Sequence, residues 1–368
     1  MKEKSLPKYA QLKKEILEWL DTGKLRPNDQ MPSENELAEQ FGLSRQTVRQ
    51  TLGELEQEGR LYRIQGKGTF VSESSRIERG VGMEAPAIGL VTTYISNYIF
   101  PHIVRGVEAA VRSRSCRLML ASTDNDKGRE RDILSMLASQ PLSGLIIEPT
   151  KSAEGNPNLA YFLALNNQSI PYVMIHASYP ELSCPSLVVD DEEGGYAAAL
   201  HLLQLGHRRI AGFFKTDDLQ GVLRLKGFMR AHQQESCSLP PDQVVTYRTE
   251  EKETKPIEEA ARLLSRSDAE RPTALVCYND ELAVQLLEAI RKAGLSVPQD
   301  VSVVGFDDSS LATATEVKLT SLTHPMEKMG EDAASLLFEM IESGGGAAVP
   351  ASKRYKPELI VRESTRRL

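Results

Sequence analysis

Two arginines one helical turn apart, Arg45 and Arg49, stand with Gln46 in the segment LSRQTVRQTLGEL. The fork of an arginine matches the acceptors of guanine, and a glutamine amide pairs with adenine, so these side chains could read base edges in a DNA major groove. Ser44 and Thr47, at the start of the segment, have hydroxyls suited to phosphate oxygens. For Arg45 alone, a solvated helix face is an equally good interpretation. The elements around the segment must therefore distinguish DNA binding from a solvated helix face.

A first helix is predicted within PKYAQLKKEILEWLDTGKL, because its apolar residues recur at helical spacing. The inward positions are Tyr9, Leu12, Ile16 and Trp19, or its neighbour Leu20. We assign Trp19 to the small core of this domain and not to a ligand site. Pro7 suits the start of such a helix.

A second helix is predicted in PSENELAEQFG, where Ser33 and Glu36 form a capping box and Gly42 ends the helix. After the short link GLS, Ser44 caps the arginine-bearing helix. Two short helices joined this tightly indicate a helix-turn-helix, whose second helix presents its first turns to DNA. The inward positions of that helix are Val48, Leu52 and Leu55.

A hairpin follows, with LYRI and TFVS on either side of QGKG. The glycines allow positive φ angles at the turn, and Lys67 lies at its tip. Such a wing could reach an adjacent groove with Gln65, Lys67 and Thr69. The combination of capped helix, tight turn, arginine-bearing helix and basic hairpin favours DNA binding over a merely solvated surface.

The stretch PSENELAEQFGLSRQTVRQTLGELEQEGRLYRIQGKGTFV resembles the winged helix-turn-helix of GntR-family transcription regulators over about residues 5–72. The resemblance implies operator contacts at several of the residues already considered. They are Glu34, Arg45, Gln46, Thr47, Arg49, Gln65 and Gly66, with Lys8 as a weaker candidate.

The bulk composition is that of a globular protein, with 368 residues, 40% hydrophobic and 26% charged. The net charge is −7, and residues 1–80 carry 14 basic and 13 acidic side chains, so DNA binding requires a local basic patch. No apolar run approaches the ~18 residues of a membrane helix, and the N-terminus lacks the apolar stretch of a secretion signal. We therefore expect a cytoplasmic protein without a membrane partner. Four scattered cysteines indicate free thiols and no zinc site.

Beyond a Ser-, Gly- and charge-rich linker over residues 73–87, apolar strands and amphipathic helices alternate to the C-terminus. This pattern predicts buried parallel sheets, and roughly nine units exceed one open sheet, so we expect two similar subdomains. The predicted fold is an α+β winged helix-turn-helix domain over residues 1–72 and an α/β core over residues 88–368. The core should resemble periplasmic binding proteins, with two parallel-sheet subdomains.

The ends of the predicted core strands are polar, and ligands of parallel sheets sit beyond these ends. The residues are Tyr94, Glu148, His176, Lys215, Asn279, Asp280, Asp307 and Asp308. Carboxylates, amides, a cation and aromatic rings together suit a polyhydroxylated ligand.

Each of these residues also has a structural interpretation. Asp280 stands just before ELAVQLL, where capping the helix is our first interpretation. His176 could be a structural histidine, and Glu148 could serve a loop because Pro149 follows it. A surface ion pair is one interpretation of Arg224, but its apolar neighbours in GVLRLKGF favour a buried cation that needs a partner.

This second part resembles the effector core of LacI/GalR-family regulators over about residues 87–365. The stretches IGLVTTYISNYIFPHIVRGVEAAV, DDEEGGYAAALHLLQLGHRRIAGF, ALVCYNDELAVQLLEAI and GLSVPQDVSVVGFDDS carry the resemblance. The residues that match the family's ligand positions are Tyr98, Glu148, His176, Arg224, Asn279, Asp307 and His324. A GntR-type head replaces the family's usual DNA-binding head and hinge helix, so the mechanism of that hinge does not carry over.

The joined head and core resemble repressors of arabinose-utilisation genes, on LPKYAQ, TTYISNYIFP, EPTKSA, EVKLTS and PELIVR. The resemblance implies L-arabinose as effector, a homodimer on palindromic operator DNA, and dimer contacts through helices 101–114 and 281–293. Chemistry alone indicates only a small polar ligand, and another pentose or hexose remains an alternative.

An enzyme and a secreted sugar-binding protein are the two alternative classes of protein. The core contains no P-loop, no G-x-G-x-x-G after a strand, no G-x-S-x-G and no HExxH, so we expect no catalytic residues, cofactor or metal. The predicted head and the missing signal sequence argue against a secreted binding protein.

Overall fold

The computed structural model describes residues 8–21, 24–26, 28–57, 60–64, 68–72, 85–344 and 350–368. The chain divides into two compact units, Met1–Glu84 and Ala85–Leu368. We call the first unit the head and the second the core. Residues 73–84 of the predicted linker lie outside the described residues.

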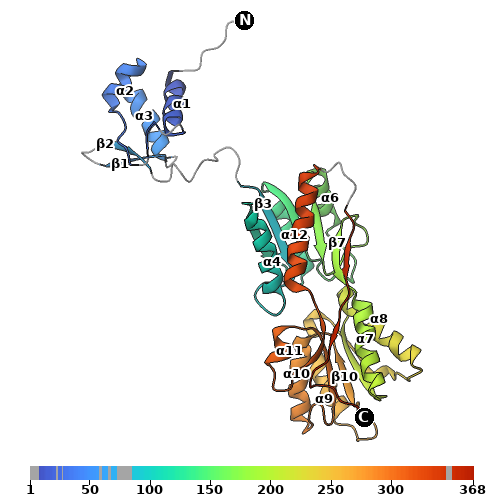
Figure 1. Cartoon of the computed structure of the whole chain (residues 1–368). Helices are drawn as coiled ribbons and strands as arrows, with labels where there is room; N and C mark the ends of the chain where they lie inside the picture. The colour runs from blue at the N-terminus through green and yellow to red at the C-terminus, as the bar shows by residue number, and fades with distance from the viewer. Residues whose placement is uncertain are drawn as a thin grey trace. The chain divides into compact units, whose positions relative to one another are not determined.

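The described part of the head is a helix-turn-helix with an antiparallel hairpin, as predicted (Figure 1). Trp19 is buried and packs 6.2 Å from Phe41, measured between ring centroids. Tyr9 was expected to point inward but is 52% exposed, because it lies in the first turn of its helix and its hydroxyl favours solvent. The head elements are α1 (Lys8–Asp21), α2 (Glu34–Phe41), α3 (Arg45–Gln57), β1 (Leu61–Ile64) and β2 (Gly68–Val71).

The turn between α2 and α3 is set by side-chain and backbone caps. The Glu36 amide donates to Ser33 Oγ at 3.3 Å, and the Ser33 amide donates to the Glu36 carboxylate at 2.7 Å. Gly42 ends α2 with a φ of 60°, and the Thr47 amide donates to Ser44 Oγ at 3.1 Å. These contacts confirm both predicted caps, and those of Gly42 and Ser44 shape the turn between the two helices.

The core contains two mainly parallel six-stranded sheets, which confirms the two predicted subdomains (Figure 1). The first subdomain has the strand order β13-β7-β6-β5-β3-β4, and the second has the order β14-β12-β11-β10-β8-β9. Among the described core strands, only β14 runs antiparallel to its neighbour, β12. Parallel strands bury both faces under helices, which explains their nearly continuous apolar sequences.

The first subdomain comprises β3 (Ala87–Thr92), α4 (Phe100–Ser113), β4 (Arg117–Ser122), α5 (Lys127–Ala138), β5 (Leu142–Ile147), α6 (Leu159–Asn167), β6 (Tyr172–Ile175), β7 (Ser186–Val189), α12 (Met326–Glu342) and β13 (Lys353–Tyr355). The second comprises α7 (Asp191–Gln204), β8 (Ile210–Lys215), α8 (Leu219–Gln234), β9 (Val244–Tyr247), α9 (Lys255–Leu264), β10 (Ala274–Cys277), α10 (Asp280–Lys292), β11 (Ser302–Asp307), α11 (Ser310–Ala314), β12 (Thr320–Thr323) and β14 (Leu359–Ile360). Short 3₁₀ turns span Pro241–Gln243 and Thr249–Glu251.

The chain crosses between the subdomains three times. The crossovers lie between β7 and α7, between β12 and α12, and between β13 and β14. Asp191 and His324 therefore sit at or beside a crossover. A polar side chain placed there lies beside a connecting segment and also faces the space between the subdomains.

Helices α7 and α8 pack backbone to backbone because each has a glycine at the contact. A Cβ on Gly195 would lie 2.0 Å from the Arg224 carbonyl oxygen, and a Cβ on Gly227 would lie 1.9 Å from the Glu192 carbonyl oxygen. No larger residue fits without moving a helix. This close contact fixes the helix turn that carries Arg224.

Candidate functional site

The predicted recognition helix presents its polar residues to solvent. Arg45, Gln46 and Arg49 are exposed, whereas Val48, Leu52 and Leu55 are buried as predicted. Ser44 Oγ lies 2.8 Å from Thr47 Oγ1, so both hydroxyls stand at the first turn of α3. These five candidate residues therefore lie at the cap and in the first two turns of α3.

Glu34, at the start of α2, holds Arg49. Arg49 Nη2 lies 2.7 Å from Glu34 Oε2, and Arg49 Nε donates to both carboxylate oxygens at 3.1 Å. Arg63 Nη2 lies 3.6 Å from the same carboxylate. The hydrogen bond from Arg49 lowers the pKa of Glu34. The Arg49 side chain is still 66% exposed, so the contact orients its fork and leaves it accessible.

Four candidate DNA-contacting positions cannot be placed. Gln65, Gly66 and Lys67, at the tip of the hairpin, lie outside the described residues, as does the side chain of Lys8. The strands beneath the tip are described, with Ile64 opposite Gly68 and Leu61 opposite Val71. Gly68 has a φ of 119°, a conformation that favours glycine at the end of such a turn.

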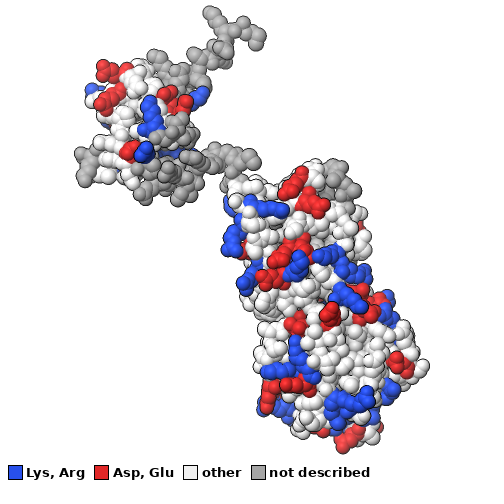
Figure 2. Space-filling view, in the orientation of Figure 1, with Lys and Arg blue, Asp and Glu red and all other residues white. Residues whose placement is uncertain are grey.

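Charges on the visible face of the core are mixed. Figure 2 shows acidic and basic side chains interspersed over α4 and α12, where Arg105 pairs with Glu327 and Arg114 with Glu342. A surface with both signs interspersed does not build the single-sign field that attracts DNA. This face of the core thus offers less to a phosphate backbone than α3 does.

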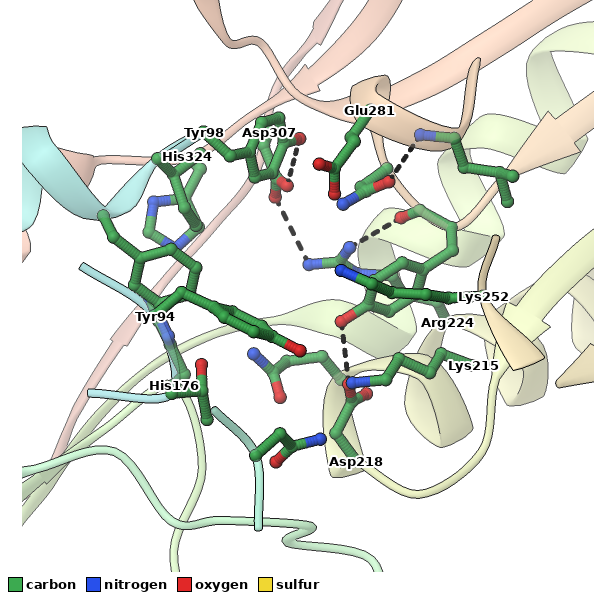
Figure 3. Close-up of a pocket in the computed structure, with 18 of the residues that line it drawn as sticks. Tyr94, Tyr98, His176, Lys215, Asp218, Arg224, Lys252, Glu281, Asp307 and His324 are labelled. Atoms are coloured by element: carbon green, nitrogen blue, oxygen red, sulfur yellow. Dashed lines mark hydrogen bonds and ion pairs between the residues drawn. The ribbon is translucent and has the colours of Figure 1, made fainter. Parts of the chain in front are cut away.

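A cleft between the two core subdomains, beyond the carboxyl ends of their strands, contains the second candidate site. Its empty volume, counted with its open mouth, is about 1030 Å³. Figure 3 shows side chains converging on it from both subdomains. All eight residues predicted for an effector line this one cavity: Tyr98, Glu148, His176, Lys215, Arg224, Asn279, Asp307 and His324.

Arg224 is a buried cation with partners on several sides. Its Nε donates to Asp191 Oδ1 at 2.8 Å, its Nη1 donates to the Tyr278 carbonyl at 2.7 Å, and its Nη2 lies 3.4 Å from Asp307 Oδ1. The guanidinium carbon lies 3.5 Å from the centre of the Phe306 ring. Burial raises the pKa of Asp191 to about 6, although Arg224 opposes that shift. The prediction of a buried cation that requires a partner is confirmed.

Glu148, His176 and His324 form the wall contributed by the first subdomain and its crossover. Thr93 donates to Glu148 Oε2 through its amide and its hydroxyl, each at 2.7 Å, and His176 Nδ1 lies 2.8 Å from Oε1. Burial opposes the charge on Glu148, but His176 and Thr93 outweigh it and lower the pKa of the carboxyl. Glu148 therefore accepts hydrogen bonds as an anion.

The two histidines have opposite shifts. Burial alone would lower the pKa of His176, but the Glu148 carboxylate raises it; burial and the nearby His176 hold the pKa of His324 well below its usual value. Nε2 of His176 and Nδ1 of His324 are buried, and neither has a hydrogen-bond partner among the described residues. Buried nitrogens of this kind are able to form a hydrogen bond with a ligand or an ordered water.

Lys215 lies at the end of β8 and is held by two acidic side chains. Its Nζ is 3.0 Å from Asp218 Oδ2 and 3.6 Å from Asp217 Oδ1. The Tyr278 hydroxyl donates to Asp218 Oδ2 at 2.9 Å. The pKa of Lys215 is raised, because the two carboxylates outweigh the effect of burial.

Tyr98 bridges the subdomains. It comes from the loop before α4, and its hydroxyl donates to Asp307 Oδ2 at 2.6 Å in the second subdomain, with the Phe306 carbonyl at 3.1 Å. The Tyr98 hydroxyl oxygen also accepts from the Asp280 amide at 3.2 Å. Tyr98, His176 and Asp307 have φ angles of 60°, 65° and 92°, so strained backbone is concentrated at this cavity.

The interpretation of Asp280 as a helix cap is wrong. Asn279 caps α10, accepting from the Leu282 amide at 2.9 Å. Asp280 is fully buried and accepts from the amide and hydroxyl of Ser309 and from the Ser321 hydroxyl, at 2.6 to 3.0 Å. The sequence could not distinguish Asn279 from Asp280 as the cap, because the cap is whichever of two adjacent polar side chains accepts from a backbone amide of the first turn.

Several residues that line the cavity were not among the predicted site residues. Asp191 opens α7 in the acidic run DDEEGG, and Asp218 caps α8; polar residues at strand-to-helix turns are the signal that would have found them. Figure 3 shows Tyr94, Lys252 and Glu281 beside the cavity. Tyr94, which the polar strand ends predicted, also lines the cavity. The polar or aromatic lining residues that were not predicted include Asn97, Asn125, Asp191, Asp218, Gln220, Tyr247, Lys252, Tyr278, Glu281 and Gln285.

Known proteins match both parts of the chain. Residues 8–71 match the family of bacterial regulatory proteins called gntR, and residues 199–365 match the periplasmic binding protein-like domain. A protein named arabinose metabolism transcriptional repressor, from Geobacillus stearothermophilus, is 59% identical over 368 residues, with 100% of both chains covered. The chain belongs to the arabinose metabolism transcriptional repressors. A repressor of the same name from Halalkalibacterium halodurans is 45% identical over 97% of this chain and 96% of its own.

Solved structures place the core of this repressor among LacI-type regulators. A LacI family transcriptional regulator from Enterococcus faecium, solved with bound ribose, is 27% identical, covers 77% of this chain and 99% of its own, and has a TM-score of 0.65. The regulator CcpA of Lactococcus lactis, 22% identical, covers 77% of this chain and 100% of its own with a TM-score of 0.66, which shows the common fold.

The remaining features fit a regulator of this family. All four cysteines are free thiols, as predicted. Among the described helices, none has the length and apolar character required to cross a bilayer. The relatives reported above are named as transcription regulators, not as enzymes.

Proposed function

We propose that this repressor binds palindromic operator DNA as a dimer in the cytoplasm, binds L-arabinose in the core cleft, and releases the DNA when the sugar is bound. It acts as a regulator and catalyses no reaction. The observation that carries the proposal is the convergence of all eight predicted effector residues on one cavity, in a chain similar over its full length to a named arabinose repressor.

The electrostatics of the cleft suit a neutral sugar. Its buried cations are already paired with carboxylates, Arg224 with Asp191 and Lys215 with Asp218, so a charged ligand would disturb a balanced set. Hydroxyl groups can donate to the carboxylates and accept from the cations without changing that balance. The unpartnered ring nitrogens of His176 and His324 supply further polar positions.

The names of relatives favour a pentose. Two relatives are named for arabinose metabolism, and the Enterococcus faecium regulator was solved with ribose. Ribose, another pentose, is the principal competitor for the role of effector. These repressors are named for the metabolism that they regulate, so the identity of the bound sugar is part of the proposal.

The proposed DNA contacts come from the head. Arg45, Gln46 and Arg49 would reach base edges, while Ser44 and Thr47 would contact phosphates. Glu34 would act mainly by orienting Arg49. Two heads of a dimer would occupy successive major grooves, about 34–36 Å apart. The dimer itself would form through α4 and α10, the helices expected over 101–114 and 281–293.

Release requires that the sugar favour one arrangement of the core over another. A ligand shifts an equilibrium only by its differential affinity, so a 100-fold loss of DNA affinity needs about 2.7 kcal/mol of coupling. Closure of the cleft is the proposed source, because Arg224, Tyr98 and His324 come from different sides of the crossovers and approach one another only when the subdomains are close.

Titration of sugars into a preformed complex with DNA tests the proposal. The complex of the full chain with a fragment selected for tight binding would be followed by fluorescence anisotropy at constant ionic strength. L-Arabinose should dissociate it, while D-galactose should not. Dissociation by D-ribose alone would move the assignment to another pentose. If no monosaccharide changes DNA affinity, the proposed function is wrong.

A further inference from the structure

A second set of polar contacts joins the core subdomains beside the effector cavity. The Leu219 amide donates to Ser152 Oγ at 2.9 Å, and the Ala153 amide donates to the Asp217 carbonyl at 3.3 Å. Two ion pairs flank these hydrogen bonds, Lys151 with Glu250 and Glu154 with Arg248. We call these eight residues the clasp. Residues 151–154 belong to the first subdomain, and the partners belong to the second.

Asn125 ties the clasp to the cavity wall. Its Oδ1 accepts from the Lys151 amide at 2.8 Å, and its Nδ2 donates to Thr249 Oγ1 at 2.6 Å in the other subdomain. Its φ of 55° is a left-handed conformation that asparagine tolerates better than most residues. Asn125 lines the cavity, yet both ends of its amide already have protein partners.

The first-subdomain half of the clasp is held rigidly from behind. Glu130 is fully buried and accepts from the Tyr179 hydroxyl at 2.6 Å, from the Thr150 amide at 3.1 Å and from Asn158 Nδ2 at 2.7 Å. These bonds fix both ends of the loop that carries residues 151–154. A preorganised loop loses little entropy when it makes its contacts.

The clasp is continuous with residues that face the cavity. Asp218 lies between Asp217 and Leu219, and Lys252 follows the segment with Arg248 and Glu250. Lys252 Nζ lies 5.0 Å from the centre of the Tyr94 ring, which belongs to the first subdomain. Formation of the clasp therefore brings Asp218 and Lys252 to the cavity together with Tyr94.

We propose that the clasp sets the sugar affinity of the cleft without contacting the sugar, by stabilising the closed arrangement of the subdomains. Its members are positioning residues, and the proposal rests on the proposed sugar-binding function. Because the clasp is made only by protein groups, it also favours closure before sugar arrives. Weakening it should raise the concentration of sugar needed for a response.

The two ion pairs of the clasp should make sugar affinity depend on salt concentration. An arabinose molecule carries no charge, so its binding has no direct salt dependence. The side chains of Glu250 and Arg248 are 60% and 54% exposed, so salt should screen their pairs. Sugar affinity of the wild type should therefore fall about twofold to fivefold between low salt and 0.5 M NaCl, within the range expected for two exposed ion pairs.

A charge-reversal cycle tests the proposal in the full chain. Lys151→Glu and Glu250→Lys should each weaken L-arabinose binding about fivefold, and the double variant should recover to within about twofold of wild type. Binding would be measured by titration calorimetry at low salt. Arg266→Gln is the matched control, because Arg266 pairs with Asp242 outside the clasp. This control should bind sugar as the wild type does.

Hydrogen exchange in the sugar-free protein supplies an independent readout. The amides of Ala153 and Leu219 have their partners across the cleft, so peptides that contain them should exchange more slowly in the wild type than in either single variant. Sugar affinity unchanged in both single variants, with unchanged exchange at these amides, would overturn the proposal. If the wild type binds no sugar at all, the proposed function fails instead, and salt-dependent exchange of the same two amides still decides whether the clasp exists in solution.

Discussion

Removal of one hydroxyl, in Tyr98→Phe, tests the contribution of subdomain closure to sugar binding. The hydroxyl donates to Asp307 Oδ2 at 2.6 Å and accepts from the Asp280 amide at 3.2 Å, and both partners lie in the opposite subdomain. In an open cleft, water replaces these contacts. The substitution should therefore destabilise the closed arrangement selectively and leave the open arrangement nearly unchanged.

The expected magnitude follows from the type of bond. A hydrogen bond to a charged group contributes about 1.5–3 kcal/mol net, which corresponds to roughly a 10-fold to 100-fold change in an equilibrium constant. The Kd for L-arabinose, measured by titration calorimetry, should rise by that factor in Tyr98→Phe. DNA affinity in the absence of sugar should remain within about twofold of wild type, since the head is untouched.

Tyr355→Phe is the matched control. Tyr355 donates to Asp332 Oδ2, also at 2.6 Å, but both residues lie in the first subdomain. It should lose a similar hydrogen bond, visible as a small decrease in unfolding temperature, and keep its sugar affinity. If Tyr98→Phe binds L-arabinose as tightly as wild type, or if both variants lose the same affinity, the interpretation of Tyr98 as a bridge specific to the closed cleft is refuted.

Three further outcomes are expected. Arg45→Ala and Arg49→Ala should each lose about 1–3 kcal/mol of specific operator binding in footprinting or anisotropy, with sugar affinity retained; unchanged footprints in both would remove α3 as the recognition helix. Arg224→Gln leaves two buried carboxylates without their cation, so calorimetry should show lost sugar binding and about 3–5 kcal/mol lower stability, while DNA binding persists without release; wild-type sugar affinity would place the effector elsewhere. Deletion of residues 1–72 should leave a folded dimer that binds sugar, and sedimentation of a monomer at micromolar concentration would contradict dimerisation through the core.

Local patterns predicted the head almost completely. Ser33 and Glu36 cap a helix within four residues, Gly42 ends it, and Val48 and Leu52 recur at helical spacing, so every signal lies close to the feature that it specifies. The prediction that Tyr9 is buried was wrong, because periodicity indicates which side of a helix a residue faces and not whether another element covers that side.

The core was predicted in outline, with gaps where strands are short. Apolar stretches of the sequence predicted the strands that became β3, β4, β5, β6, β8, β10 and β11. They did not predict β7, β9, β12, β13 and β14, which span two to four residues each. A short strand acquires its character from its neighbours in the sheet. Strand β13 pairs with β7, more than 160 residues away in the sequence, and no local pattern carries that information.

The cavity residues were found because strand ends and a family resemblance pointed to the same positions. Their bonding partners were not. The Tyr98 hydroxyl meets Asp307, and Asp280 meets Ser309 and Ser321, through contacts that only the folded sheet creates. Residue types could therefore predict where the cavity lies, whereas the distribution of protons and charges within it required the three-dimensional arrangement.

The three crossovers have a consequence for how the protein is made. Strand β13 is an edge strand of the first subdomain and β14 is an edge strand of the second, so residues 353–360 serve both subdomains. During synthesis the head can fold as soon as it leaves the ribosome, because all its elements are contiguous. Neither half of the core can be completed until β13 and β14 have been translated. A nascent repressor would thus fold its helix-turn-helix head before the cavity between the core subdomains, and a chain that terminates early would contain the head and lack the cavity.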